Sequence, residues 1–211
     1  MERNEILKNF YVIEGLDGAG TTTQLRMIVQ QLQECGKKAF LTFEPTTSEI
    51  GLLIKRILKG EAEATGLALA YLYAADRENH VNHPETGIRA HLENGETVIS
   101  DRYFFSSLAY QTMASSFDKI WSLNCGFPYP EAVIFIDTPV SECIKRIENR
   151  GEKKEIFEKQ NLLSAVKENY EKAFKMMPEE VKLYRFDGTA PKEQIQNEIM
   201  DQVFGKTTSG K

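Results

Sequence analysis

A glycine-rich turn near the start of the chain constrains its fold more than any other segment. The apolar run 10–13 predicts a strand, and the apolar residues at 25, 28, 29 and 32 form the i, i+3, i+4, i+7 stripe of a helix. Residues 15–22, Gly-Leu-Asp-Gly-Ala-Gly-Thr-Thr, join the two. Glycines there let the backbone curl with its N–H groups pointing inward, in front of a helix N-terminus. The unit therefore predicts an anion-binding turn in an α/β sheet.

The rest of the chain alternates in the same way between short apolar runs and helical stripes. Strands are predicted over 39–43, 97–100, 133–136 and 181–186, and helices over about 50–58, 66–83, 139–147 and 162–177, with another after Pro191. Buried strands separated by helices are typical of a doubly wound parallel sheet with helices on both faces. We therefore predict one α/β domain over residues 1–204 and a flexible tail over 205–211, which has no apolar anchor.

The composition disfavours several classes of partner. Lys and Arg total 26 against 31 Asp and Glu, a formal net charge of −5, so nucleic acid and anionic membranes would be repelled by the whole chain. The longest wholly apolar run, 132–136, is too short to cross a bilayer, and the polar start lacks the apolar core of a signal peptide. Three scattered cysteines indicate neither a disulfide framework nor a zinc ribbon. We expect a cytoplasmic protein that binds small molecules.

The turn reproduces the phosphate-loop pattern in everything except its lysine, whose place is taken by Thr21. A threonine donates one hydrogen bond but carries no charge. Two alternatives are a glycine-rich turn without a ligand and a loop that binds nucleotide but no longer turns it over. We assign binding of a polyphosphate ligand to the loop residues Gly15, Leu16, Asp17, Gly18, Ala19, Gly20, Thr21, Thr22 and Thr23.

Four segments together make the chain resemble the thymidylate kinases, phosphate-loop enzymes that transfer the γ-phosphoryl group of ATP to dTMP. They are residues 14–24, 43–45 with 50–51, 73–77, and 100–111. The resemblance extends from Phe10 to the last helix. It implies a nucleoside monophosphate kinase fold with a lid at about 149–160. It also implies ATP and Mg²⁺ as cofactors, small-molecule nucleotides as ligands, and a homodimer.

Tyr73 and Arg77 are four residues apart and therefore lie on one side of a predicted helix. An aromatic ring can stack on a nucleobase, and a guanidinium can donate to its carbonyl edge. The resemblance gives the two residues this role toward thymine. The spacing alone favours a blander arrangement, a core tyrosine with Arg77 paired to Asp76 or Glu78 at the surface.

Residues 100–111 carry the most specific part of the resemblance. It implies that Arg102 holds the acceptor phosphate and that Ser107 meets the edge of the base. It also implies that Tyr110 crowds out a 2′-hydroxyl, and Gln111 lies on the same helical face. The alternative is a polar helix N-terminus with Ser106 as its cap.

Three aspartates are candidates for work near a bound phosphate. Asp101 follows a buried strand, where a carboxylate linked to magnesium is expected, and Thr22 is the second metal-site residue. The resemblance places Asp17 near the 3′-hydroxyl of the acceptor and the magnesium shell; the alternative is an ordinary turn residue. Asp137 also follows an apolar strand, but 138–139 is typical of a helix start, so we assign it no metal.

Basic residues crowd into 145–154, where the resemblance implies a mobile lid. With Gly18 rather than a cation in the phosphate loop, the chain resembles the type whose lid supplies the catalytic charge. Interleaved glutamates make a solvated, mutually paired surface the alternative. Lid closure would exclude water and bring charge to the phosphates. We assign catalysis to Lys153 and Lys154 beside Arg102 and Asp17, and ATP binding to Arg146 and Arg150.

Phe43 is a second departure from the family, because bacterial relatives often have an arginine there that helps to hold the acceptor phosphate. Together with Thr21, it removes two cations from one site. The function predicted first is phosphorylation of dTMP to dTDP. The alternatives are a kinase of another pyrimidine nucleotide or of a deoxynucleoside, and a nucleotide-binding relative with lost or weak activity.

Three histidines, His80, His83 and His91, lie within twelve positions of each other. No cysteine or closing pattern accompanies them. We therefore expect surface histidines on helices rather than a metal site.

Overall fold

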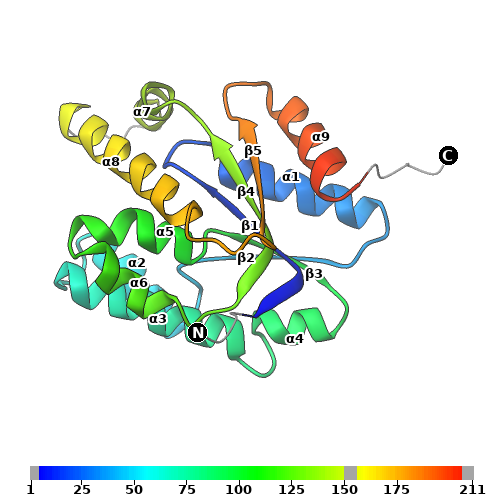
Figure 1. Ribbon diagram of the computed structural model, residues 1–211, viewed down its shortest axis with the longest axis horizontal. Coiled ribbons are helices and arrows are strands. Elements are labelled where there is room, and N and C mark those ends of the chain that lie inside the picture. The colour runs from blue at the N-terminus through cyan, green and yellow to red at the C-terminus, as the bar shows by residue number, and fades with distance from the viewer. Residues whose placement is uncertain (1–4, 150–155, 206–211) are drawn as a thin grey trace.

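The computed structural model describes residues 5–149 and 156–205. Within these ranges all strands form one parallel sheet in the order β2-β3-β1-β4-β5 (Figure 1). The predicted α/β class with a parallel sheet is therefore confirmed. The strands are β1 (Ile6–Gly15), β2 (Ala39–Phe43), β3 (Thr97–Asp101), β4 (Tyr129–Asp137) and β5 (Lys182–Asp187).

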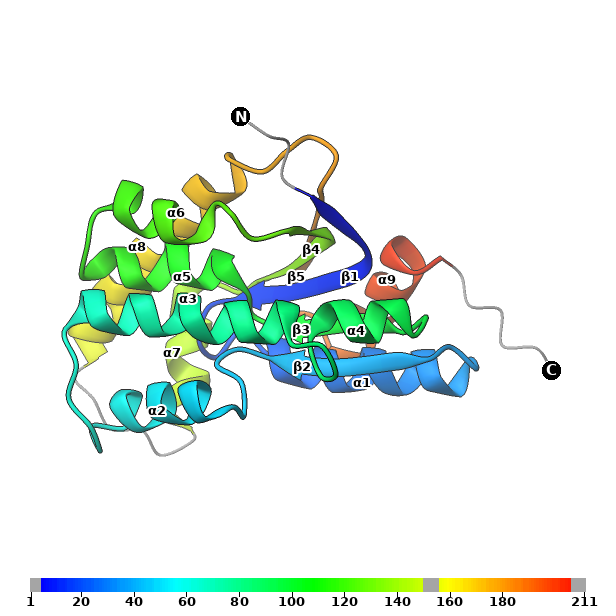
Figure 2. The same ribbon diagram turned by 90° about the horizontal axis from the view of Figure 1, so that it is seen from below.

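Helices cover both faces of this sheet (Figures 1 and 2). The helices α1 and α9 contact each other on one face, and α3, α5 and α8 lie on the other. The bounds are α1 (Thr21–Glu34), α2 (Glu49–Leu58), α3 (Gly66–Asn82), α4 (Ile88–Glu93), α5 (Phe104–Tyr110), α6 (Phe117–Asn124), α7 (Val140–Glu148), α8 (Ile156–Phe174) and α9 (Lys192–Val203), with a 3₁₀ turn at Gln111–Met113.

The buried core runs along the central strands, whose apolar residues face helices on both sides. Residues 12, 13, 98, 99, 133 and 134 are all fully buried, as expected for a parallel sheet covered on both faces. The helix α6 was not predicted from the sequence; Ser116 caps it, accepting from the N–H of Lys119 at 3.3 Å. The predicted lid at about 149–160 and the predicted tail lie largely outside the described residues.

The register of the strands brings the predicted site residues to one edge of the sheet. Ile13 pairs with Asp101, and Phe43 pairs with Asp101 from the other side. Gly15 pairs with Ile136. The phosphate loop therefore begins at the edge where β2, β3 and β4 also end, which is where ligands bind on such sheets.

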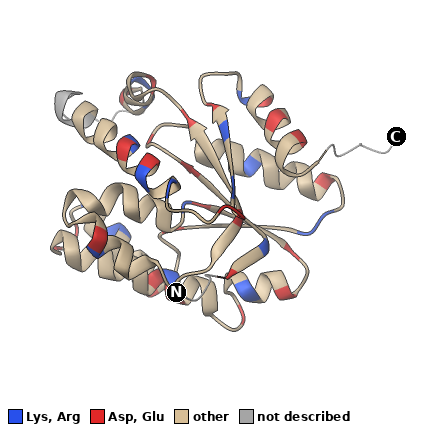
Figure 3. Cartoon of the chain, in the orientation of Figure 1, with Lys and Arg blue, Asp and Glu red and all other residues tan. Residues whose placement is uncertain are grey.

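Charges of both signs are interleaved along the helices (Figure 3). Surface ion pairs such as Arg185–Glu171 at 2.7 Å and Arg89–Glu5 at 2.5 Å join neighbouring elements. Within the part of the chain that the structure describes, no helix combines the length and the apolar character needed to cross a membrane.

Candidate active site

Glycines shape the loop that joins β1 to α1. Gly18 and Gly20 have φ angles of 85° and 102°, in the left-handed region that side chains avoid. A Cβ atom on Gly18 would lie 2.6 Å from the carbonyl oxygen of Cys143, at α7. The loop is therefore a tight turn packed against α7. Its conformation leaves no room for a side chain at Gly18.

Arg146 ties this loop to the opposite wall of the site. Its Nη1 donates to the carbonyl of Ala19 at 3.2 Å, and its Nη2 donates to the carbonyl of Gly188 at 3.0 Å, beyond β5. Glu142 accepts from its Nε at 3.0 Å. The predicted ATP-site residue Arg146 thus lies at the phosphate loop, with its guanidinium bridging two backbone segments.

A hydroxyl and a carboxylate meet beside the loop. Thr22 Oγ1 donates to Oδ2 of Asp101 at 2.6 Å, and Oδ1 of Asp101 is buried with no hydrogen-bond partner in the described structure. Oxygen ligands of this kind suit Mg²⁺, which keeps its remaining positions for water and phosphate oxygens. The two residues predicted for the metal therefore fit a magnesium ion. No group of three or more acidic, histidine or cysteine side chains suited to a metal occurs in the described ranges.

A cavity of about 410 Å³ opens between α3, α5 and the facing side of α8, with Asp17 and Arg102 in its wall. We call it the acceptor cavity. A volume of this order holds a small organic ligand. Every residue predicted from the resemblance to contact the acceptor lines this one cavity: Asp17, Tyr73, Arg77, Arg102, Ser107, Tyr110 and Gln111.

Arg77 lines this cavity, with only 1% of its surface exposed. Its Nε and Nη2 donate to Oε2 of Glu44 at 2.9 and 2.6 Å, and Nη2 also donates to Ser107 at 3.0 Å. Nη1 donates to Oδ1 of Asn124. A guanidinium has five N–H groups, so one N–H on Nη1 has no partner among the described residues. The surface pairing with Asp76 or Glu78 that spacing alone favours is wrong, since Asp76 accepts from Thr46 at 2.7 Å instead.

Arg102 lies between the cavity and the phosphate loop. Its φ angle of 71° is unusual for a residue with a side chain. Its Nη2 donates to Oδ1 of Asp17 at 2.5 Å, and its guanidinium lies 5.1 Å from the ring centre of Tyr110. The hydroxyl of Tyr110 in turn accepts from the N–H of Asp17 at 3.0 Å. Three predicted residues thus form one contact group that links both halves of the site.

Glu14 is a site residue that the sequence analysis missed. It is fully buried at the end of β1 and accepts from the N–H of Tyr103 at 2.9 Å, from Ser106 at 2.6 Å and from the Tyr170 hydroxyl at 2.8 Å. Burial raises its pKa to about 7, while the charge of Arg102 and these hydrogen bonds act in the opposite direction. The signal was present in the sequence, because an acid in an otherwise apolar strand needs partners.

Ser106 belongs to the buried group around Glu14. The alternative interpretation of residues 100–111, with Ser106 as a helix cap, is therefore wrong. The N-cap position of α5 is Tyr103, which makes no side-chain cap hydrogen bond. Ser106 Oγ donates to Glu14 and accepts from Nη1 of Arg102 at 3.0 Å. It therefore joins a buried carboxylate to the guanidinium predicted to hold phosphate.

His80 corrects the expectation of a surface histidine. It is 7% exposed on the inner side of α3, where its Nδ1 lies 3.0 Å from Oε1 of Glu44 and its Nε2 lies 2.6 Å from the hydroxyl of Thr42. Glu44 is thereby held on both oxygens, by His80 and by Arg77. A helical wheel cannot show this arrangement, because Glu44 and Thr42 come from β2 and its following loop.

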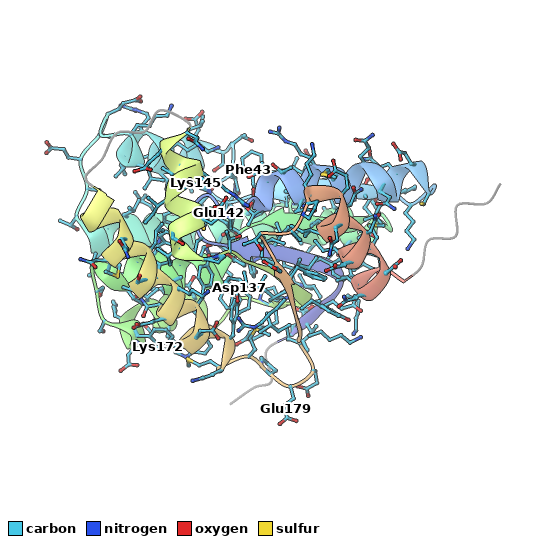
Figure 4. The ribbon with its side chains drawn as sticks, turned by 90° about the horizontal axis from the view of Figure 1, so that it is seen from above. Phe43, Asp137, Glu142, Lys145, Lys172 and Glu179 are labelled. Carbon is cyan, nitrogen blue, oxygen red and sulfur yellow. The ribbon has the colours of Figure 1, made fainter. Side chains whose placement is uncertain are left out.

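The remaining predicted residues are distributed as follows. Gln111 reaches the cavity with its buried Oε1 lacking a partner in the described structure. Asp137 accepts from Nζ of Lys167 at 2.6 Å. Figure 4 shows Asp137 at the end of β4, with Glu142 and Lys145 on α7. Three predicted residues, Arg150, Lys153 and Lys154, lie outside the described residues.

Comparison with known proteins gives the same family for the whole domain. A family model described as thymidylate kinase matches residues 13–199. A protein of Treponema pallidum with thymidylate kinase in its name is 42% identical over 170 residues, covering 81% of each chain. Similarly named proteins of Pyrococcus horikoshii and Thermococcus onnurineus are 41% and 40% identical, covering 81% and 92% of this chain and 84% and 96% of theirs. The chain therefore belongs to the thymidylate kinase family.

Proposed function

We propose that this protein phosphorylates dTMP to dTDP with MgATP as the donor. The observation that carries the proposal is the convergence of Arg102, Asp17 and Tyr110 between the acceptor cavity and the phosphate loop. A kinase of this kind needs two phosphate-bearing ligands whose phosphates meet, and this contact group lies at the junction. The names of the relatives in the same family support dTMP as the acceptor.

Recognition of thymine is assigned to Arg77, Ser107 and Tyr73. The one N–H of Arg77 without a partner among the described residues is the donor offered to a base carbonyl. Ser107 accepts from Arg77 at 3.0 Å, so its own hydroxyl hydrogen remains to be donated. Tyr73 lines the same cavity, where burial raises its pKa to about 12. It stays neutral and offers its ring for stacking on the base.

Transfer of the phosphoryl group proceeds by positioning and charge neutralisation. An oxygen of the acceptor monophosphate attacks the γ-phosphorus of ATP as the bond to the β-phosphate oxygen breaks, and ADP leaves with that bond's electrons. Arg102 orients the attacking phosphate, and the loop amides hold the donor phosphates. Magnesium, when bound at Thr22 and Asp101, neutralises charge on the transferred group.

The charge that Thr21 lacks is assigned to the lid. Thr21 is 8% exposed, and its methyl carbon faces Gly15: a Cβ on Gly15 would lie 2.9 Å from it. The side chain thus fills space under the loop and supplies no cation. We assign that role to Lys153 or Lys154, with Arg150 beside the ATP phosphates. From the family resemblance we also propose a homodimer in the cytoplasm.

The experiment that tests the proposal measures ADP release from MgATP by the purified protein. Acceptors are dTMP, dUMP, dCMP, UMP and thymidine, compared at equal concentrations. We expect turnover selective for dTMP. Selective turnover of another pyrimidine acceptor would move the assignment to that substrate. A folded protein that binds MgATP without turning over any acceptor would instead be a nucleotide-binding relative.

A further inference from the structure

A second cavity, of about 310 Å³, adjoins the acceptor cavity at Arg102. It is bounded by α1, by the ends of β2 and β3, and by α2. Its wall includes the metal-site pair Thr22 and Asp101. It shares Glu44, Pro45 and Arg102 with the acceptor cavity. A ligand phosphate held by Arg102 therefore has this second cavity beside it.

The charges around the cavity are unbalanced toward the positive. Its cations are Arg26, Lys55 and Arg102, and its acids are Glu44 and Asp101. Glu44 is buried and already neutralised by Arg77. Asp101, hydrogen-bonded to Thr22, is one of the two residues assigned to magnesium. Neither Arg26 nor Lys55 forms an ion pair with any residue in the described ranges. Arg26 and Lys55 therefore offer unpaired positive charge beside the proposed magnesium site, an environment that favours a phosphate dianion.

Lys55 is placed by a contact with Phe43 and by the close packing of its helix. Its Nζ lies 4.7 Å from the ring centre of Phe43, the last residue of β2. The helix α2 packs closely against the loop before it: a Cβ atom on Gly51 would lie only 2.3 Å from the carbonyl oxygen of Thr46. Lys55 is one helical turn beyond Gly51, on the same side of α2. The ring of Phe43 and the close packing of α2 thus hold the Lys55 ammonium at the cavity.

We propose that Lys55, positioned by the ring of Phe43, binds the phosphate of the acceptor nucleotide together with Arg102. The inference rests on the proposed function, since it names a further phosphate-binding residue for the same site. The ligand class is a nucleoside 5′-monophosphate dianion. A residue with this role distinguishes dTMP from thymidine, which would occupy the acceptor cavity but has no phosphate.

The test compares binding of dTMP and of thymidine, each without ATP, by calorimetry. Lys55→Gln is expected to weaken dTMP binding about 10-fold or more, the loss of one charge-assisted hydrogen bond, and to leave thymidine binding unchanged. In the kinase assay it raises KM for dTMP and leaves KM for ATP unchanged. Arg56→Gln is the matched control, since Arg56 is an exposed cation next in the chain that does not line the cavity. It is expected to change neither affinity.

Phe43→Leu tests the positioning contact separately. It is expected to weaken dTMP binding less than Lys55→Gln does, and to cause no further loss in the Lys55→Gln background. Unchanged dTMP affinity in Lys55→Gln would overturn the inference. So would equal losses of dTMP and thymidine binding, because these would indicate general damage to the site. Lys55-dependent dTMP binding without turnover would overturn the proposed function and leave the inference standing.

Discussion

The hydroxyl of Thr22, in the first turn of α1, donates a 2.6 Å hydrogen bond to Oδ2 of Asp101 at the end of β3. The pairing of Ile13 with Asp101 fixes this carboxylate relative to β1, and the same strand leads into the loop before Thr22. The other oxygen of Asp101 is buried without a partner in the described structure. A buried acceptor left unpaired is costly, and a metal ion with its waters would satisfy it.

Thr22→Val and Asp101→Asn are therefore expected to raise the Mg²⁺ concentration needed for half-maximal turnover, each by about 10–100-fold. Both variants should reach a higher fraction of wild-type activity as Mg²⁺ is increased. Because the two side chains act through one hydrogen bond, the double variant should lose less than the product of the single losses. A Mg²⁺ titration of ADP release measures all three. Unaltered Mg²⁺ dependence in both single variants would remove the metal assignment.

The Arg77–Glu44 pair predicts a large difference between buried and exposed ion pairs. Both side chains are nearly inaccessible, at 1% and 2% exposed, whereas the exposed pair Arg89–Glu5 is 36% and 54% exposed. Glu44→Ala leaves a buried guanidinium unpaired and is expected to lower the free energy of unfolding by about 3–5 kcal/mol. Glu5→Ala should cost less than about 1 kcal/mol. Urea denaturation measures both, and similar costs would contradict the burial of Arg77.

The same pair also predicts an effect on substrate recognition. Arg77→Lys keeps the charge but loses the planar fork that contacts Glu44, Ser107 and Asn124 together. The lysine cannot hold a spare N–H toward the base while satisfying these partners. We expect KM for dTMP to rise about 10-fold or more, with KM for ATP unchanged. Steady-state kinetics with each substrate varied in turn checks this, and equal rises in both KM values would argue against a role at the base.

Glu14 predicts a pH-dependent contribution to stability. Burial raises its pKa from 4.5 to about 7, so between these pH values the folded protein keeps a proton that the unfolded chain has released. Stability contributed by this group is therefore fully present below pH 4.5 and is lost as the pH rises to about 7. The loss is about 3 kcal/mol, from about 1.36 kcal/mol for each pKa unit. The loss of stability is complete about one unit above the folded pKa, at pH ~8.

Urea denaturation of the wild type and of Glu14→Gln at pH 5 and at pH 8 measures this effect. The glutamine cannot ionise, so its stability should lack this component. The wild type should lose stability relative to the variant between the two pH values. A difference between the two proteins that stays constant with pH would mean that the Glu14 carboxyl titrates at its ordinary value.

The sheet and the loop were predictable because their signals are local. Apolar runs and helical stripes give the element order, and the glycines at 18 and 20 are required by positive φ angles within the turn itself. That certain residues would gather in one cavity was predictable by a different route. Spacing alone favoured a surface role for Arg77, and only the family resemblance placed it in the cavity. Arg77 lines the cavity because Glu44 neutralises its guanidinium and Asn124, also distant in sequence, accepts a hydrogen bond from it.

The missed features all depend on tertiary contacts. The buried site of His80 needs Glu44 and Thr42 from another element, and no periodicity reveals that. Glu14 did carry a local signal, an acid between apolar residues and a glycine, but its partner Tyr170 lies 156 positions away. The cluster of cations around Lys55 likewise joins three elements that the sequence separates.

The absence of a lysine from the phosphate loop predicts that a cation outside the loop acts on the transferred phosphoryl group. The buried side chain of Thr21 supplies no cation, so the transferred phosphoryl group depends on charge from elsewhere. If Lys153 or Lys154 provides it, alanine at the residue responsible should lower kcat by about 10²–10³-fold, the usual cost of removing a preorganised donor to the transition state. Affinity for dTMP, measured without ATP, should not change. Lys145→Ala is the matched control, because Lys145 is 70% exposed and its nearest acid, Glu142, is 3.9 Å away.

Thr21→Lys should then restore part of the lost kcat in the lid variant, because the new ammonium arises from the loop position where phosphate loops carry their lysine. In the wild type the same substitution should raise kcat little, since the lid already supplies the charge. Single-turnover rates at saturating MgATP and dTMP measure both effects. Thermal melting checks that the bulkier residue is accommodated beneath the loop. A lid variant that loses kcat and gains nothing from Thr21→Lys would mean that the lid cation acts on a different part of the phosphates. Full activity in Lys153→Ala, Lys154→Ala and their double variant would exclude the lid lysines as the source.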